Sequence, residues 1–267
     1  MQDDAQKPFR QNDILDPARA NACLRALGRF ADIETGVYLP PFFHQLYFWD
    51  AQPPTNLGRD GHPKLGGIIP DMGLPRRMWA GGQLEFLAPL RAGLPATKTT
   101  TVHKALHKKG RTGPLGFVTL CHEIAQNGII AVREYQDLVY REDPTPDSPK
   151  LTSAAARTDE VSSVTHSFDS TLLFRYSALT FNGHRIHYDL DYARDVEGYT
   201  GLVVHGPLLA QLLMLFAQEY LDQLSHFSFR ATAPLMHFEP ATFCWGGDGT
   251  LWVRGPDGRR CMTATAS

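Results

Sequence analysis

The sequence predicts an α+β fold of two modules, each an antiparallel sheet around a helix. One segment, 207–224, is apolar around most of a helical circumference. Strand-like runs separated by turn residues lie on both sides of it along the chain. Residues 143–163 lose nearly all large apolar side chains and divide the 267 residues into two halves. A chain of this length accommodates two domains of ordinary size.

The first half is predicted to open with a helix over 13–30, because Asp16-Pro17 is a cap followed by proline at the first helical position. A short helix is expected within 38–49, beginning at its two prolines. A glycine- and proline-rich loop, 55–75, then precedes four strand-like runs at 77–87, 96–107, 115–124 and 129–140. Asn127-Gly128 between the last two runs predicts a hairpin.

The second half is predicted to contain a strand over 167–177, a polar loop over 179–193 and the helix over 207–224. Short strands are expected at 227–233, 241–245, 250–254 and 261–265. A helix that is apolar on nearly all sides is buried. One buried helix surrounded by an antiparallel sheet is the plan of a hot-dog module, and the first half repeats it in degenerate form. The predicted organisation is a double hot-dog with modules at 1–142 and 166–267 and a linker at 143–165.

The composition excludes several classes of function. A formal net charge of -2 provides no basic excess for a phosphate backbone, so we expect no nucleic-acid partner. The longest apolar stretch, 208–216, is too short to cross a bilayer, and the polar N-terminal segment does not resemble a signal peptide, so we expect no membrane association. Four scattered cysteines without a C-x-x-C pair are typical of free thiols in a cytoplasmic protein.

The densest group of chemically useful residues lies in 176–191. It includes Asn182, His184, His187 and Asp189. Histidine is the common general acid or base because its ordinary pKa is near neutrality.

A second feature, His205-Gly206-Pro207, opens the apolar helix. The first N–H groups of a helix have no intrahelical partner, and glycine allows a substrate to approach the backbone closely. The Gly206 N–H is therefore a candidate oxyanion donor for a thioester carbonyl. Ordinary helix capping is the alternative explanation of Gly206-Pro207.

The second half resembles the MaoC-type, or hydratase-2, hot-dog family. That family has an Asp-x-Asn-Pro-x-His motif, followed by an apolar-His-Gly helix start. The matching stretch here is Asn182-Gly183-His184-Arg185-Ile186-His187, followed by Tyr188-Asp189 and later by His205-Gly206. The resemblance implies that His187 is the general base and Gly206 the oxyanion donor. The sequence departs from the motif at Asn182, His184 and Arg185, which replace Asp, Asn and Pro.

The whole chain resembles one branch of this family. The branch contains mesaconyl-C4-CoA (3-methylfumaryl-CoA) hydratases, itaconyl-CoA hydratases and mitochondrial type 2 hydroxyacyl-thioester dehydratases. Its further marks here are LGRDGHPKLGG and LPRRMWAGGQLEF in the first half. The resemblance implies a hydro-lyase that adds water reversibly across the double bond of an enoyl thioester. It implies no cofactor, since coenzyme A is part of the acyl-CoA substrate. Because hot-dog modules usually pair, we expect a homodimer.

Replacement of the motif Asp by Asn182 leaves two arrangements open, because an amide cannot accept a proton. Either Asn182 orients the water for His187, or Asp189 supplies the charge. A dicarboxylic acyl-CoA also needs a cation for its free carboxylate, and arginine binds carboxylates bidentately. The predicted substrate contacts are Arg185, Arg76, Arg77, His184, His205 and Trp79.

Several other functions compete with a dicarboxylic enoyl-CoA hydratase. The spacing His184-x-x-His187-x-Asp189 also suits a metal site, but the family resemblance argues against it and we predict none. A dehydratase of straight-chain (R)-3-hydroxyacyl-CoA or acyl-carrier-protein thioesters uses the same residues. A hot-dog thioesterase or a non-catalytic acyl-thioester-binding protein shares the fold. Release of free coenzyme A thiol distinguishes a thioesterase from a hydratase.

Overall fold

The computed structural model describes residues 7–110, 113–145 and 153–267 of the chain. Within these residues, ten antiparallel strands form one sheet in the order β1-β3-β4-β5-β2-β7-β10-β9-β8-β6. The strands are β1 Phe9–Ile14, β2 Arg76–Phe86, β3 Pro95–Gly110, β4 Gly113–Gln126, β5 Ile129–Arg141, β6 Ser162–His166, β7 His226–Ala231, β8 Ala241–Trp245, β9 Thr250–Arg254 and β10 Arg260–Ala266.

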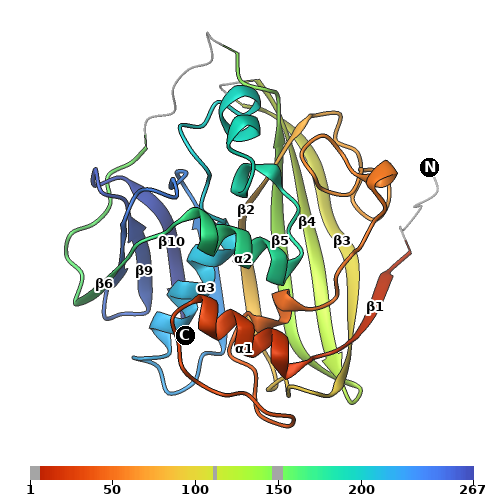
Figure 1. Ribbon diagram of the computed structural model, residues 1–267, viewed down its shortest axis with the longest axis vertical. Coiled ribbons are helices and arrows are strands. Elements are labelled where there is room, and N and C mark those ends of the chain that lie inside the picture. The colour runs from red at the N-terminus through yellow and green to blue at the C-terminus, as the bar shows by residue number, and fades with distance from the viewer. Residues whose placement is uncertain (1–6, 111–112, 146–152) are drawn as a thin grey trace.

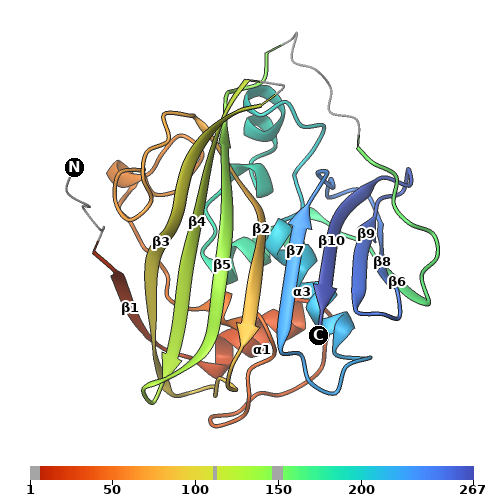
Figure 2. The ribbon, with the colours of Figure 1, turned by 180° about the vertical axis from the view of Figure 1, so that it is seen from behind.

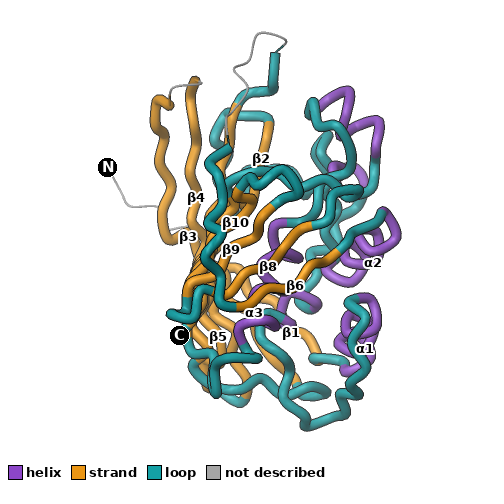
Figure 3. The backbone as a smooth tube through the Cα atoms, turned by 90° about the vertical axis from the view of Figure 1, so that its left-hand side faces the viewer, coloured by secondary structure: helices purple, strands orange, loops and turns teal. Residues whose placement is uncertain are grey.

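The helices lie together on one side of this sheet, as the side view in Figure 3 shows. The helices are α1 Pro17–Ala26, α2 Ser170–Thr180 and α3 Gly206–Ala217, with short helical segments η1 Phe43–Leu46, η2 Pro54–Asn56, η3 Arg185–His187 and η4 Tyr192–Val196.

The two halves of the chain meet between β2 and β7. These strands pair from Gly81 opposite Arg230 to Glu85 opposite His226. The first half contributes five adjacent strands, β1 to β5, and the second half contributes the other five, β6 to β10 (Figure 2). The predicted α+β double hot-dog is therefore confirmed, with the two sheets fused edge to edge into one.

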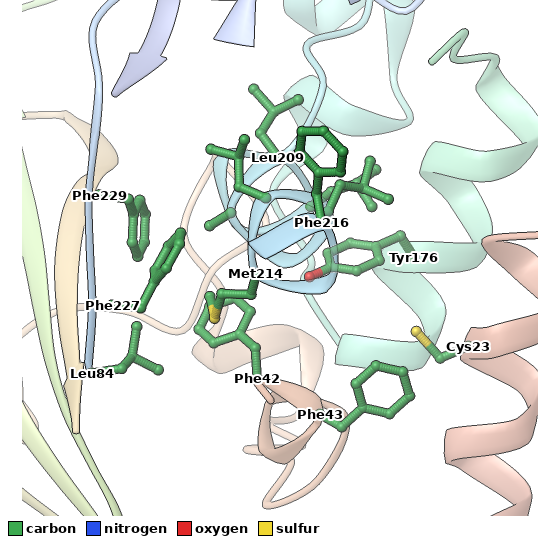
Figure 4. Packing of buried hydrophobic residues seen from close by; sticks show 14 of the residues in the cluster. Cys23, Phe42, Phe43, Leu84, Tyr176, Leu209, Met214, Phe216, Phe227 and Phe229 are labelled. Carbon is green, nitrogen blue, oxygen red and sulfur yellow. The ribbon is translucent and has the colours of Figure 1, made fainter. Parts of the chain in front are cut away.

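A single core joins the halves around α3. Every residue of α3 after Gly206 is buried. Figure 4 shows Leu209 and Met214 of α3 among aromatic side chains from other elements. Phe42 comes from the segment before η1, and Phe229 from β7. Because both halves supply this apolar surface, α3 is covered only when both are present.

Several predicted elements agree closely with the structure. The strands over 241–245 and 250–254 have the predicted bounds, and Asn127-Gly128 connects β4 to β5 as a hairpin. Both turn residues have positive φ, 52° and 78°, which is what favours Asn-Gly there. The predicted Asp16 cap is also present, since its carboxylate accepts the Ala18 N–H at 2.8 Å.

The strand predicted over 167–177 is wrong, because this segment forms most of α2. Asp169 caps the helix by accepting the Leu172 N–H at 2.7 Å. Leu173, Tyr176 and Ser177 are its buried residues, and this spacing of three and four belongs to a helix face. Tertiary burial of that face outweighs the strand propensity of its aromatic and threonine residues.

Two predicted helices are too long. The first begins at Pro17, since Asp13 and Ile14 belong to β1, an edge strand that the sequence analysis missed. The helix predicted to reach residue 224 ends at Ala217. Residues 218–220 are exposed and form a turn, so they gain no burial by continuing the helix.

The predicted linker, 143–165, contains both described and undescribed residues. Residues 146–152 lie outside the described part of the chain. Beyond them, the Ala154 carbonyl accepts the Arg260 N–H at 2.9 Å, so the chain runs along β10 before it enters β6 at Ser162. In the described residues, no helix has the length and apolar character needed to cross a membrane.

Candidate active site

A cavity of about 1590 Å³ lies where the two halves meet on the helix-bearing side of the sheet. The first half contributes β2 and the loop over 55–75. The second half contributes the segment 182–188 and the start of α3. Seven of the predicted site residues line this cavity: His187, Asn182, His184, Gly206, Arg76, Arg77 and Trp79.

His187, at the end of η3, has the environment of a neutral base. Its Nδ1–H donates to the Val203 carbonyl at 2.7 Å, which leaves the lone pair on Nε2. Burial lowers the pKa of His187 to about 3, although the hydrogen bond to Val203 opposes this shift. At neutral pH, His187 is therefore unprotonated, and its tautomer is set by the backbone. Neither Asn182 nor Asp189 is its hydrogen-bond partner.

His205 lies behind His187 and does not line the cavity. The two rings are stacked, with centroids 3.6 Å apart and an angle of 20° between the planes. His205 Nε2 is hydrogen-bonded to the Ser177 hydroxyl of α2 at 2.8 Å. Burial lowers the pKa of His205 well below its ordinary value, so a neutral ring supports His187 from behind. His205, which the sequence predicted as a substrate contact, thus lies where it can orient His187 and not where it lines the cavity.

Gly206 begins α3 and faces the cavity. Among the described residues, no acceptor is hydrogen-bonded to its N–H. A Cβ at this position would meet only the Trp79 carbonyl, at an ordinary contact distance of 3.7 Å. Neither backbone conformation nor internal packing therefore requires glycine here. The presence of glycine instead fits a ligand that approaches the N–H from the cavity.

Asn182 and His184 form a tight turn at the cavity wall. The Asn182 side-chain oxygen accepts the His184 N–H at 3.0 Å, so this oxygen shapes the backbone. His184 is buried, and within the described chain its Nε2 has no hydrogen-bond partner. Burial, followed by the nearby His62 charge, lowers the pKa of His184 well below its ordinary value. Its ring lies 5.5 Å from that of His187.

Asp189 and Arg185 are bonded to each other and not to the cavity. Two guanidinium nitrogens of Arg185 donate to one Asp189 oxygen, at 3.0 and 2.7 Å. The other Asp189 oxygen accepts the Tyr192 N–H at 3.0 Å. Neither residue lines the cavity. This pair braces the turn that presents His187, and the structure does not bring Asp189 together with His187.

The adjacent arginines of β2 differ in their partners. Arg76 is buried and donates to the Glu197 carboxylate at 2.6 Å, so its charge is already compensated. Arg77 is half-buried in the cavity wall. In the described ranges, no carboxylate oxygen lies within 4.0 Å of the Arg77 guanidinium. Trp79, also at the wall, donates its indole N–H to the Gly81 carbonyl at 2.9 Å.

Two further residues of this site were not singled out from the sequence. His62 lines the cavity, and its ring lies 4.6 Å from that of His184. Asp60 holds His62 by a 2.8 Å contact between its carboxylate and Nδ1. The signal that could have found them is the repeated triplet Asp60-Gly61-His62 and Asn182-Gly183-His184. Single-chain patterns do not reveal that two such distant triplets are in contact.

The predicted metal-like spacing does not form a cluster, because Asp189 is paired with Arg185. A different trio is close together: Asp60, His62 and His184 each offer a ligand atom within 4.8 Å of the others. Both carboxylate oxygens of Asp60 already accept from His62, one from Nδ1 and one from the backbone N–H. Asp60 and His62 are thus bonded to each other, whereas His184 Nε2 has no hydrogen-bond partner among the described residues.

Comparison with known proteins agrees with this arrangement. The family model of hydroxyacyl-thioester dehydratase type 2 matches residues 42–237, which include the cavity loop, His187 and α3. The chain belongs to this family. Its named relatives are hydratases and dehydratases, so the protein is an enzyme of the hydro-lyase type.

Three similar proteins illustrate the range of the type 2 dehydratase family and its fold. A mesaconyl-C(4)-CoA hydratase of Chloroflexus aurantiacus is 44% identical over 238 residues, covering 85% of this chain and 82% of that protein. A mitochondrial type 2 hydroxyacyl-thioester dehydratase of Schizosaccharomyces pombe is 29% identical, covering 80% of each chain. A Mycobacterium tuberculosis structure with a double hot-dog fold superposes with a TM-score of 0.59 at 13% identity, covering 98% and 95%. At that identity, the structural match concerns the fold alone.

Proposed function

We propose that this type 2 dehydratase-family enzyme hydrates a short, branched dicarboxylic enoyl-CoA, either 3-methylfumaryl-CoA or itaconyl-CoA, without a cofactor. The observation that favours a dicarboxylic substrate is Arg77, a guanidinium in the cavity wall without a carboxylate partner among the described residues. The Chloroflexus relative, named for mesaconyl-C(4)-CoA, supports the same substrate class.

The location of Arg77 agrees with the shape of such a substrate. In 3-methylfumaryl-CoA, the free carboxylate is attached directly to the double bond that takes up water. A cation that binds this carboxylate must therefore lie beside the acid–base groups. Arg77 lines the same cavity as His187. Its charge lowers the pKa of His62, second only to burial, and lowers the pKa of Asp60 after the larger effects of burial and of His62.

For 3-methylfumaryl-CoA, whose double bond is conjugated with the thioester, the proposed reaction uses His187 and Gly206. His187 Nε2 removes a proton from water while the water oxygen bonds to the β-carbon. The π electrons move toward the thioester oxygen, whose developing charge is stabilised by the Gly206 N–H. The imidazolium of His187 then returns a proton to the α-carbon. Such a preorganised donor contributes about 3–4 kcal/mol to transition-state stabilisation.

The test is the turnover of crotonyl-CoA, mesaconyl-C4-CoA and itaconyl-CoA by the wild type, His187→Ala and Arg77→Gln. We expect the wild type to hydrate a dicarboxylic member and His187→Ala to be inactive. Arg77→Gln should lower kcat/KM for that member by about 10- to 100-fold, since a charge-assisted hydrogen bond contributes roughly 1.5–3 kcal/mol. Turnover of crotonyl-CoA, which lacks the carboxylate, should change much less.

The comparison variant is Arg185→Gln, which removes an arginine bonded to Asp189 outside the cavity wall. It should affect both kinds of substrate equally. If Arg77→Gln also lowers both equally, the dicarboxylic assignment is wrong. Release of free thiol without hydration would instead indicate a thioesterase.

A dehydratase of straight-chain (R)-3-hydroxyacyl thioesters is the second candidate. The cavity of about 1590 Å³ favours it, because this space exceeds the needs of a four-carbon acyl group. Turnover of crotonyl-CoA and longer enoyl thioesters in preference to dicarboxylic ones would support it. A homodimer and a cytoplasmic location stay predictions, to be checked by sedimentation and by cell fractionation.

A further inference from the structure

The two halves contribute matching turns to the cavity. In Asp60-Gly61-His62, the Asp60 side chain accepts the His62 N–H at 3.1 Å. In Asn182-Gly183-His184, the Asn182 side chain accepts the His184 N–H at 3.0 Å. Both turns therefore have an aspartate-type side chain bonded to the backbone two residues later, with glycine between.

The turns are packed against each other through their glycines. A Cβ on Gly61 would lie 2.0 Å from the Gly183 carbonyl oxygen, and one on Gly183 would lie 2.5 Å from the Gly61 oxygen. The Asp60 carbonyl also accepts the Arg185 N–H at 2.9 Å. This close approach brings the two histidine rings to a centroid distance of 4.6 Å at the cavity wall.

The turns differ in one chemical group. Asp60 has a second carboxylate oxygen, which lies 2.8 Å from His62 Nδ1. This bond places the proton on Nδ1 and the lone pair on Nε2, the same tautomer that Val203 imposes on His187. Asn182 has an amide in place of the carboxylate, so His184 lacks an acidic partner from its own turn. The site therefore contains two imidazoles with set tautomers, and one of them has a carboxylate behind it.

We propose that His62, held by Asp60, is a second catalytic acid–base group of the site, supplied by the first half of the chain. Together with His187 it binds the attacking water, and each Nε2 accepts one of the two water hydrogens. This inference rests on the proposed hydratase function. It accounts for the carboxylate that the second half lacks, because Asp60 occupies in the first turn the position that Asn182 occupies in the second.

The proton balance of the step is complete without another reactant. The water oxygen bonds to the β-carbon, and one water proton moves to an imidazole Nε2. The π electrons pass to the thioester oxygen near Gly206, and the imidazolium then protonates the α-carbon. The Asp60 carboxylate stabilises a positive charge on His62, as the acid of a hydrolase triad does for its histidine. The Val203 carbonyl is neutral, so it stabilises a positive charge on His187 less than a carboxylate would.

The test compares His62→Gln and Asp60→Asn with matched controls on a substrate that the wild type hydrates. Asp60→Asn retains the side-chain oxygen that accepts the His62 N–H and removes only the charge. Its control is Asp71→Asn, an exposed aspartate of the same loop that makes the equivalent bond to the Gly73 N–H. His103→Gln, an exposed histidine of β3, is the control for His62→Gln.

We expect His62→Gln to lower kcat by about 10²- to 10⁴-fold, the usual contribution of a general acid–base group, with little change in KM. Asp60→Asn should lower kcat by about 10²-fold. It should also move the acid limb of the kcat–pH profile to lower pH, because the Asp60 charge raises the pKa of His62 against burial and Arg77. Both controls should retain wild-type kcat, and urea unfolding should show whether each variant is folded.

The charged and titratable groups that face His62 are Asp60, Arg77, His184 and His187.

A folded His62→Gln variant with kcat within threefold of the wild type overturns the inference, as does an acid limb unchanged by Asp60→Asn. If His187→Ala abolishes turnover and His62→Gln does not, hydration stands and only this inference fails. If the wild type hydrates no member of the panel, the proposed function itself fails.

Discussion

The chemistry of the site depends on how individual polar residues are paired. Of the three arginines considered for a substrate carboxylate, Arg76 is bonded to Glu197 and Arg185 to Asp189. Only Arg77 remains at the cavity wall without a carboxylate partner in the described ranges. The buried Arg76 cannot change partners without leaving the buried Glu197 carboxylate uncompensated, which costs several kcal/mol, and Arg185 does not line the cavity. Pairing, and not residue type, therefore makes Arg77 the proposed substrate contact.

At the same scale, Gly206→Ala separates ligand approach from helix stability. The added methyl group meets only the Trp79 carbonyl at 3.7 Å, so the free energy of unfolding should stay within about 1 kcal/mol of the wild type or rise. The methyl group should nevertheless displace the thioester oxygen from the N–H. We expect kcat for enoyl-CoA hydration to fall by about 10²- to 10³-fold. Equal turnover by the variant would show that the substrate does not need the close approach that glycine allows at this position.

At the scale of elements, the site is made by two loops that neither half could position alone. The loop over 55–75 has few strands or helices of its own and is held against 182–188 by backbone contacts. Residues 42–237, the span of the family model, include both loops. A long loop that is ordered by another module is usually functional. This loop supplies two residues of the candidate site, His62 and Asp60.

Gly61→Ala tests this contact between loops. Gly61 has φ +86°, and its added Cβ would lie 2.0 Å from the Gly183 oxygen. The matched control is Gly66→Ala in the same loop, where φ is +96° but nothing lies within 4 Å of the added Cβ. Both variants incur the left-handed backbone cost of roughly 1–2 kcal/mol. Only Gly61→Ala should also separate the turns.

We expect hydration by Gly61→Ala to fall by at least about tenfold, and hydration by Gly66→Ala to stay near the wild type. Urea unfolding of both variants measures the backbone cost that they share. An equal loss of activity in both would mean that loop strain, and not contact between the turns, affects catalysis.

At the scale of the whole molecule, one core and several buried imidazoles link stability to pH. Burial lowers the pKa of His187 to about 3, and of His62 and His122 to about 4. The unfolded chain binds these protons near pH 6.5, so it is favoured as the pH falls below that value. Stability from these groups is complete above about pH 6.5 and is lost toward pH 3.

We therefore expect the free energy of unfolding to fall between pH 7 and pH 5, by up to about 2 kcal/mol for each such imidazole. Urea titrations at several pH values measure this dependence. His122→Gln, which removes a titrating group of the first half that does not line the cavity, should make the dependence shallower. The exposed His103→Gln variant is its control. A dependence that is the same in both variants would contradict the assignment of buried, neutral imidazoles.

The sequence by itself determined the strand-rich plan, the buried helix and the principal residues of the site. Strand-like runs between turn residues, Asn127-Gly128 and the apolar helix are local patterns whose physical meaning does not depend on distant partners. Gly206 was singled out by its place at the start of the helix, and His187 by the resemblance of its motif to a known family. Local pattern failed at α2, where capping by Asp169 and burial of Leu173 and Tyr176 outweighed strand propensity.

The tertiary structure alone decided which polar residues meet. Asp60 and Asn182 are more than a hundred residues apart, and their turns come together because β2 pairs with β7 and both halves cover α3. Ion pairing likewise joins Arg76 to Glu197 and Arg185 to Asp189. Short-range propensity is encoded residue by residue, whereas hydrogen bonding and charge compensation depend on distances that exist only after the chain has folded.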